Sequence, residues 1–538
     1  MDDGLNTGNS SEKPKSRGGA ALVALGILLS RVMGLVRQKI FAYYFGNSDY
    51  GDAFYAALKI PNFLQNLLGD GVLSASFIPV YANLLSEGKR EEADRVAGII
   101  GSVLAILVTV LVAVGVLVTP SLIDLIAPGF HGEKRDLTIR LVQIFFPGVG
   151  FLVMSAWCLG ILNSHRKFFL SYSAPVIWNL AIIGTLVYFG KSTSPAELVV
   201  LTSWGVFVGS VLQFLIQLPT VWKSAPGLRF KPLVKNPHVQ SILKNFAPVV
   251  TSRGVVQLSA YIDNVLASLL PSGAVSALAY AQSLYMLPIS LFGMSVSAAE
   301  LPNMSSAKGT PEEVAAFLRT RVAAGFKQIA FFVIPSAVGF LFLGDVMIDG
   351  LYRGGEFNQA STFYVWTVLA GSTVGLLSTT VGRLYSSTFY SLRDTRTPLK
   401  FAVLRVILTT VLGYLFGLKL PGWLGFEASW GTAGLTASAG LAGWIEYVLL
   451  RRSLRQRIGV TEAPVMFLLK TWGAAILAGA VGFGIKRLVG DTHVFLNLIW
   501  ILVPFGLIYF VLTAALGVDE SKRFINRLSS RFERKIRR

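Results

Sequence analysis

The stretch GIIGSVLAILVTVLVAVGVLVT (98–119) carries no charged side chain and decides the class of fold. A helix needs about 20 consecutive apolar residues to cross the hydrocarbon core of a bilayer, and this stretch is long enough. Of the 538 residues in the chain, 53% are hydrophobic and 14% are charged, and the mean hydropathy is +0.60. Soluble domains carry about 25% charged residues. The sequence therefore predicts an integral membrane protein with little chain left for a soluble catalytic domain.

Similar apolar stretches, bounded by glycine, proline and charged residues, predict an all-α polytopic membrane protein with about 14 transmembrane helices. The expected helices cover residues 19–45, 51–85, 94–119, 137–163, 168–190, 195–222, 240–270, 273–303, 311–343, 358–391, 397–418, 428–450, 464–486 and 494–517. An even number of spans places both termini on one side of the membrane. The connections on that side hold most of the Lys and Arg residues, so the positive-inside rule predicts that both termini are cytoplasmic.

The basic, proline-containing segment KSAPGLRFKPLVKNPH (223–238) separates the first six expected helices from the other eight. The halves match by eye at three places, which are Ser30-Arg31 with Ser252-Arg253, Gly69 with Gly293, and Pro79 with Pro302. Two parallel six-helix copies permit alternating access. The predicted parts are a disordered cytoplasmic tail (1–18), an N-lobe (19–222), a cytoplasmic linker (223–239), a C-lobe (240–455), a further helix pair (456–517) and a basic amphipathic cytoplasmic tail (518–538). The last tail is typical of a segment that contacts anionic lipid, or of one that aids retention or solubility.

Two arginines lie inside the apolar run of the first expected helix, LLSRVMGLVRQKIF (28–41). A cation at the middle of a bilayer costs about 2.5 to 3.5 kcal/mol on the insertion scale. Arg31 and Arg37 are separated by about 9 Å along the helix axis and about 120° around it. A wide aqueous cavity, or a bend at Gly34, would bring both to one site. The alternative is that each pairs with a carboxylate such as Asp52 or Asp70.

The second expected helix carries one polar face along its whole length. The residues that share an arc of about 80° on this face are Asp52, Lys59, Asn62, Asn66 and Asp70. Lipid cannot satisfy such a face, so it lines water or another polar helix. Pro61, Gly69 and Gly71 interrupt the same stretch and are candidate hinge residues. A buried ladder of interhelical hydrogen bonds is the alternative interpretation.

The seventh expected helix again places a cation on a polar face. The members of this face are Arg253, Gln257, Tyr261 and Asn264. Guanidinium groups donate paired hydrogen bonds to anionic oxygens such as those of a diphosphate, and they keep their charge. Transported cations would need an acidic centre, and none dominates the first lobe. The pattern therefore predicts an anionic substrate held by Arg31, Arg37 and Arg253.

Several classes of function are disfavoured by what the sequence lacks. It has no Gly-Lys-Ser/Thr phosphate-binding run, its four histidines lack metal-ligand spacing, and a single cysteine, Cys158, excludes an intrachain disulfide. Glu133 and Asp136 would be candidate bases of a membrane glycosyltransferase, but the adjacent Lys134 and Arg135 indicate ordinary solvated charges. The formal net charge of +19 follows from membrane topology and does not require a nucleic-acid partner. We expect a protein without a cofactor that is not an enzyme.

The chain resembles the MurJ/MviN family, lipid II flippases of the multidrug/oligosaccharidyl-lipid/polysaccharide exporter superfamily. The segments that carry the resemblance are SRVMGLVRQ (30–38), GDAFYAALKIPNFLQNLLGDG (51–71), SASFIPVY (74–81), APGF (127–130), YRGGEF (352–357) and YSLRDTRTPLK (390–400). The resemblance implies movement of the undecaprenyl-diphosphate-linked peptidoglycan precursor from the inner to the outer leaflet of the bacterial plasma membrane. It also implies that the last two helices form an apolar groove for the lipid tail.

The family's site residues carry over in part. Arg31, Arg37, Asp52 and Lys59 match the pattern, whereas Gln65 and the pair Gln282-Ser283 stand where the family has an arginine and an Asp-Arg pair. We expect Arg253 to supply the cation that position 283 lacks, with Gln65, Gln257, Gln282 and Ser283 also lining the cavity. The resemblance further implies that Asp263 is a possible sodium site; a proton gradient or the membrane potential are other possible sources of energy.

Two further functions remain open from the sequence. The first alternative is an exporter of another lipid-linked oligosaccharide or of a drug. The second is a protein that binds the precursor for a cell-wall polymerase without moving it. A drug exporter would prefer cationic substrates and function without undecaprenyl carriers. Expected partners are the lipid-linked precursor, anionic membrane lipids and cell-wall synthesis proteins.

Overall fold

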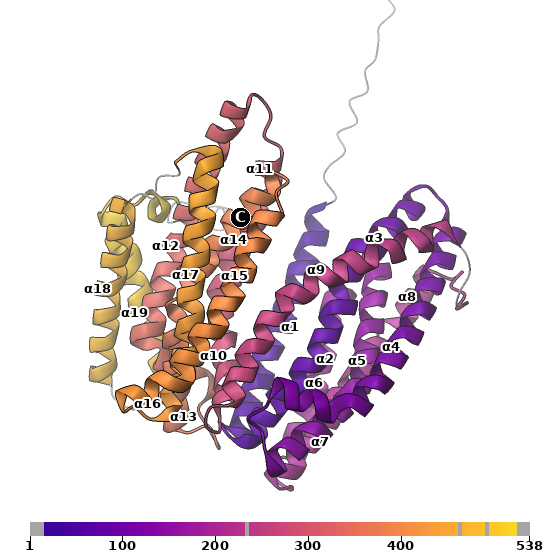
Figure 1. Cartoon of the computed structure of the whole chain (residues 1–538), viewed down its shortest axis with the longest axis horizontal. Coiled ribbons are helices and arrows are strands. Elements are labelled where there is room, and N and C mark those ends of the chain that lie inside the picture. The colour runs from indigo at the N-terminus through magenta and orange to yellow at the C-terminus, as the bar shows by residue number, and fades with distance from the viewer. Residues whose placement is uncertain (1–15, 232–235, 461–464, 490–493, 525–538) are drawn as a thin grey trace, which may run out of the picture. The chain divides into compact units, whose positions relative to one another are not determined.

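The computed structural model describes residues 16–231, 236–460, 465–489 and 494–524. Within these ranges the side chains of residues 16–24, 70–72, 75, 245–260 and 495 are outside the description. In the described part of the chain all regular structure is helical, apart from one isolated β-bridge between Gly354 and Phe357 (Figure 1). Residues 1–15 and 525–538 lie outside the described residues, so most of the two predicted tails (1–18 and 518–538) stays a prediction. The first tail is shorter than expected, because the first helix begins at Ser16.

The helices follow the expected ranges. In chain order they are α1 (Ser16–Phe45), α2 (Asp49–Leu68), α3 (Asp70–Ser86), α4 (Arg90–Ile126), α5 (Gly132–Ser164), α6 (Phe168–Phe189), α7 (Pro195–Leu215), α8 (Leu218–Ser224), α9 (Pro237–Ser268), α10 (Ala274–Pro288), the π-helix η1 (Ile289–Met294), α11 (Ser295–Ser305), α12 (Pro311–Tyr352), α13 (Gln359–Thr373), α14 (Leu376–Ser391), α15 (Arg396–Gly413), the π-helix η2 (Tyr414–Lys419), α16 (Leu420–Leu424), the 3-10 helix η3 (Ala428–Trp430), α17 (Gly431–Ile458), α18 (Val465–Val489) and α19 (Val494–Ala515).

Ten helices in the described residues are long and apolar enough to cross a membrane, or eleven if α13 and α14, bent by 43°, form one span. The all-α membrane fold is therefore confirmed. The expected number of about 14 spans is not, although every expected range contains helix. The three expected ranges that are not counted are those of α1, of α2 with α3, and of α9, and each includes side chains outside the described part of the structure. These helices contain most of the residues that the sequence singles out for function.

Local sequence explains where two of the long helices begin. Ser194 precedes α7 and accepts a hydrogen bond from the amide of Glu197, whose carboxylate accepts one from the Ser194 amide. Thr310 and Glu313 form the same reciprocal pair at the start of α12. Each pair satisfies two amides that have no partner within the helix, and a proline at the first helical position presets the backbone.

Contacts divide the chain into two compact units. Unit 1 contains residues 1–40, 57–120 and 139–257, and unit 2 contains residues 41–56, 121–138 and 258–538. The boundaries between the units fall inside α1, α2, α4, α5 and α9, so that one end of each of these helices belongs to unit 2. The predicted lobe boundaries stay predictions.

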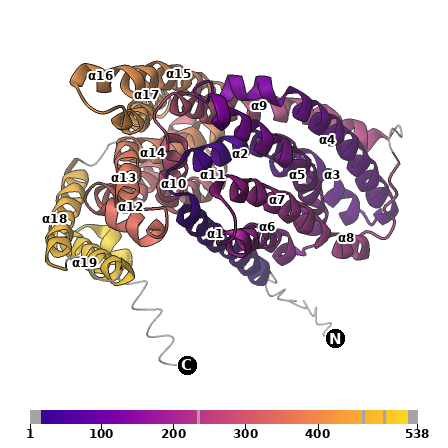
Figure 2. The same ribbon diagram turned by 90° about the horizontal axis from the view of Figure 1, so that it is seen from below.

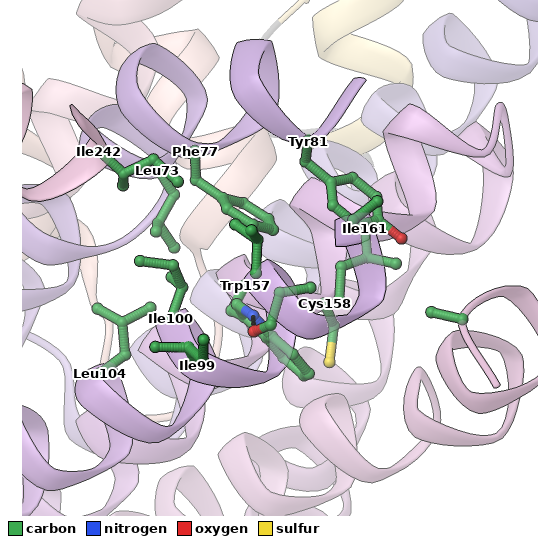
Figure 3. Close-up of a cluster of buried hydrophobic side chains, with 14 of the residues drawn as sticks. Leu73, Phe77, Tyr81, Ile99, Ile100, Leu104, Trp157, Cys158, Ile161 and Ile242 are labelled. Atoms are coloured by element: carbon green, nitrogen blue, oxygen red, sulfur yellow. Dashed lines mark hydrogen bonds between the residues drawn. The ribbon is translucent and has the colours of Figure 1, made fainter. Parts of the chain in front are cut away.

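The core of unit 1 forms around Trp157, a residue of α5 that is completely buried. Its indole N–H donates to the carbonyl of Ala97 on α4 over 3.1 Å. Figure 3 shows Phe77 and Tyr81 of α3 in the same cluster. A Cβ at Gly101 would lie 3.0 Å from the indole, so α4 approaches this ring closely at a glycine. The sealed aromatic core fixes α3, α4 and α5 as the frame of unit 1.

Unit 2 is organised around α12, against which α13, α14, α18 and α19 pack. Figures 1 and 2 both show α18 and α19 together at the side of α12. The Tyr509 hydroxyl of α19 donates to the carbonyl of Phe331 over 2.6 Å, and Lys486 of α18 forms an ion pair with Asp345. The last two helices are therefore fastened to α12 by polar contacts as well as by apolar packing.

Two local features recur at positions that correspond between the halves of the sequence. Gly69 separates α2 from α3, and its counterpart Gly293 lies in η1 between α10 and α11. The turns after α5 and after α14 each contain an arginine with positive φ, 60° at Arg166 and 59° at Arg393. In both turns this amide donates to the carbonyl three residues earlier, and the next amide donates to the carbonyl five residues earlier. These shared irregularities support the predicted repeat.

Candidate functional site

Asp52 is buried, with 1% of its surface exposed. Its carboxylate accepts hydrogen bonds of 2.8 Å from the amides of Gly273 and Ser276, at the N-terminus of α10. These amides have no partner within the helix, and the helix dipole favours a negative charge there. Asp52 is thus an anchor within unit 2 and does not face an open cavity.

Lys134 supplies the counter-charge. Its ammonium lies 2.8 Å from Asp52 and 2.6 Å from Asp49, and 4.3 Å from the centroid of the Phe130 ring. Only 16% of the Lys134 side chain is exposed. The interpretation of Lys134 as an ordinary solvated charge is therefore wrong, because tertiary structure brings this residue, in the first turn of α5, to a carboxylate 82 residues away in sequence.

The rest of the α2 face belongs to unit 1 and is accessible. Asn62 and Asn66 are exposed, whereas Lys59 and Gln65 are half-buried. On α1, Arg31 is exposed among exposed apolar side chains. Since lipid does not satisfy amide groups, the exposed side chains of Asn62 and Asn66 require water or a polar ligand.

Arg37 has a different setting. It is half-buried, and its guanidinium carbon lies 4.8 Å from the centroid of the Trp178 ring on α6. An arginine over an indole gains from the negative face of the ring while its donors still point outward. The contact holds this part of α1 against α6 within unit 1. Arg31 is therefore the more accessible of the two predicted cations on α1.

The predicted hinge residues behave differently from one another. α1 runs through Gly34 without interruption, and α2 runs through Pro61. At Gly69 the helix stops, and a Cβ there would lie 2.4 Å from the carbonyl oxygen of Gln65. Gly69 is thus a break that only glycine fits, whereas a Cβ at Gly34 would meet nothing within 4 Å.

Four predicted site residues cannot be placed as side chains. Arg253 and Gln257 lie on α9, and Asp70 and Gly71 lie at the start of α3, but the surroundings of these four residues are outside the described part of the structure. Their roles remain predictions.

A polar pocket of unit 2 contains two other predicted residues. Asp263 of α9 and Gln282 of α10 line one cavity of about 140 Å³. The neighbouring Ser283 is half-buried, and its hydroxyl donates to the carbonyl of Ala279. The same cavity contains Arg405 of α15, which the sequence analysis did not single out. Arg405 could have been identified from the sequence, because it is an arginine within the expected span 397–418, where a charged residue indicates a functional site.

The pocket gives a test of the sodium that the resemblance implies. Asp263 is a suitable ligand for a cation, but the guanidinium of Arg405 lines the same cavity and pairs with Glu446 over 3.1 Å. A site that already contains a fixed cation is a poor one for an alkali-metal ion. These residues do not fit a bound sodium. Among the described residues there is also no group of three or more His, Cys, Asp or Glu that could hold a metal ion.

Comparison with known proteins places this geometry in a family. The family model described as "Lipid II flippase MurJ" matches residues 41–504. The chain is 32% identical over 463 residues to the lipid II flippase MurJ of Burkholderia cenocepacia, with 84% of this chain and 87% of that protein covered. It is 31% identical over 441 residues to the probable lipid II flippase MurJ of Rhizobium tropici, with 80% and 79% covered.

Solved structures agree with the sequence comparison. A lipid II flippase MurJ in an inward closed conformation matches with a TM-score of 0.75 at 26% identity, over 93% of this chain and 99% of that one. An inward-facing multidrug resistance transporter of the MATE family matches with a TM-score of 0.63 at 16% identity, over 82% and 98%, which shows a shared fold alone.

Proposed function

Since the chain belongs to the lipid II flippase MurJ family, we propose that it moves the undecaprenyl-diphosphate-linked peptidoglycan precursor from the inner to the outer leaflet of the bacterial plasma membrane. The movement is by alternating access, with both termini cytoplasmic. Membership of the family supports the substrate, and the accessible polar groups on α1 and α2 support a path for its head group.

The observation that carries the proposal within the molecule is the exposure of Arg31. This residue lies in the interior of α1, between the exposed apolar side chains of Leu28 and Val36. A guanidinium group exposed at such a position is open to water and to an anionic ligand. A diphosphate head group supplies anionic oxygens in the geometry that a guanidinium recognises.

Each group of residues then has its own role in binding the substrate, and no covalent bond is made or broken. Arg31 attracts the diphosphate, with Arg37 and Arg253 as further cations. Asn62 and Asn66 offer hydrogen bonds to the head group and its water along α2, since both are exposed amides on the same helical face. The lipid tail stays in the bilayer and follows the apolar surface of α18 and α19, where Leu469, Leu477 and Leu507 are exposed.

Complementation of a bacterial strain depleted of its own lipid II flippase tests the proposal. The wild-type chain should restore growth, and Arg31→Ala should not, because removing one charge-assisted contact to the diphosphate costs about 1.5 to 3 kcal/mol. Arg31→Lys should restore growth in part, since it keeps the charge but loses the paired donors.

The matched control is Arg140→Ala, which removes another exposed helical arginine of unit 1. This variant should grow like wild type. Normal growth of Arg31→Ala at equal abundance in the membrane would show that the accessible cation on α1 does not serve transport.

A further inference from the structure

The pocket in unit 2 is built from side chains of six helices. It lies among α9, α10, α13, α14, α15 and α17, and its polar lining residues are Asp263, Gln282, Tyr285, Ser372, Thr379, Arg405 and Thr436. Its volume of about 140 Å³ is enough for several water molecules, given a share of about 30 Å³ for each. Because six helices contribute to this cavity, a change in its charge alters the electrostatic energy of side chains on all six.

Among the described residues, one carboxylate and one guanidinium group line the cavity, and a second of each lies close by. Arg405 lies 3.1 Å from Glu446, and the two side chains are 31% and 14% exposed. Arg383 of α14 is within electrostatic range of both Arg405 and Glu446. Tyr285 of α10 is within range of Asp263, Arg383 and Arg405. Two carboxylates thus accompany two guanidinium groups.

The balance between these carboxylates and guanidinium groups determines whether a further ion can bind in the cavity. Where the dielectric is low, an unbalanced charge costs far more than in water, so a charged pair is kept together. Adding a sodium ion to two carboxylates and two guanidinium groups would leave a net positive charge among membrane helices. Removing one guanidinium would leave a net negative charge, which an alkali-metal ion would offset.

We propose that the guanidinium of Arg405 is the resident cation of this pocket, and that the wild-type protein consequently binds no sodium there. Arg405 remains attached to α15, so its charge moves with that helix and is not exchanged with either side of the membrane. Transport is then independent of a sodium gradient. This last consequence rests on the proposed function, whereas the absence of sodium binding does not.

Thermal unfolding of the purified full-length protein in detergent tests the proposal without any transport. The Tm is measured in sodium chloride and in choline chloride at the same ionic strength, and the two values should agree for wild type. In Arg405→Met, sodium should raise the Tm by about 1 to 2 °C, because a ligand that binds only the folded state stabilises it. The double variant Arg405→Met/Asp263→Asn should lose this response.

Arg405→Lys is the matched control, since it keeps the charge and should stay insensitive to sodium. A sodium-specific rise in the wild-type Tm that Asp263→Asn removes would overturn the proposal, as would a folded Arg405→Met that ignores sodium. If Arg405→Met does not fold, the comparison of wild type with Asp263→Asn still decides. Flipping in liposomes with and without a sodium gradient then tests the consequence for transport, and a loss of all flipping would count against the proposed function alone.

Discussion

At the scale of single residues, Asp52 shows how one side chain serves a different purpose from the one that its helix face predicts. The pattern on α2 places Asp52 with exposed amides, yet it is buried and is satisfied by Lys134, Gly273 and Ser276. Periodicity identified the polar face correctly. It could not identify partners 82 and more than 200 residues away, because these contacts exist only after the helices have packed.

Asp52→Ala should lower the free energy of unfolding by about 3 to 5 kcal/mol, since it leaves the Lys134 ammonium and two helix-end amides without their carboxylate. Thermal unfolding of the purified protein measures the loss. Asp49→Ala is the control, because 55% of its side chain is exposed and its loss should cost no more than about 1 kcal/mol. Equal stability of the two variants would contradict the role of Asp52 as an anchor.

Asp394, in the turn between α14 and α15, links stability to pH. The amide of Thr397 holds the pKa of this carboxyl below its usual value, helped by the Thr397 hydroxyl and the charge of Arg457. A lowered folded-state pKa gives stability that is present above the unfolded pKa of about 3.9 and is lost as the pH falls through the folded value. The Tm advantage of wild type over Asp394→Ala should thus shrink below about pH 4. An advantage that is constant from pH 3 to 7 would contradict this linkage.

At the scale of elements, the sequence predicted where helices occur and failed to predict which glycines interrupt them. Gly34 and Gly69 both lie in apolar surroundings with polar neighbours, and both were candidate hinges. Only Gly69 breaks its helix. The distinction depends on the approach of the Gln65 carbonyl, a backbone contact that composition does not encode.

Gly69→Ala should therefore be poorly tolerated, because its Cβ would lie 2.4 Å from the Gln65 oxygen and the break between α2 and α3 would have to shift. Gly34→Ala should be neutral or slightly stabilising, since alanine favours a helix and has open space there. The amount of folded protein recovered after purification, followed by its Tm, separates the two. A stable Gly69→Ala with an unchanged Tm would show that the break does not need glycine.

At the scale of the whole molecule, apolar content and the family motifs predicted the helical membrane fold and the family, and both are confirmed. The pocket around Arg405 was not predicted. Its lining residues are spread over positions 263–440 of the chain, and its polar members come from six different helices. What joins them is packing, so their charges could be balanced against one another only in three dimensions.

Movement of the undecaprenyl-diphosphate-linked precursor between leaflets can be measured with purified protein in liposomes that contain this lipid. The precursor is labelled, and its protection from a reagent confined to one side of the membrane is followed over time. The precursor should cross between leaflets with wild-type protein, and Arg31→Ala should slow the crossing about tenfold or more, whereas Arg140→Ala should not. Binding of the precursor without any change of leaflet would contradict the proposed function.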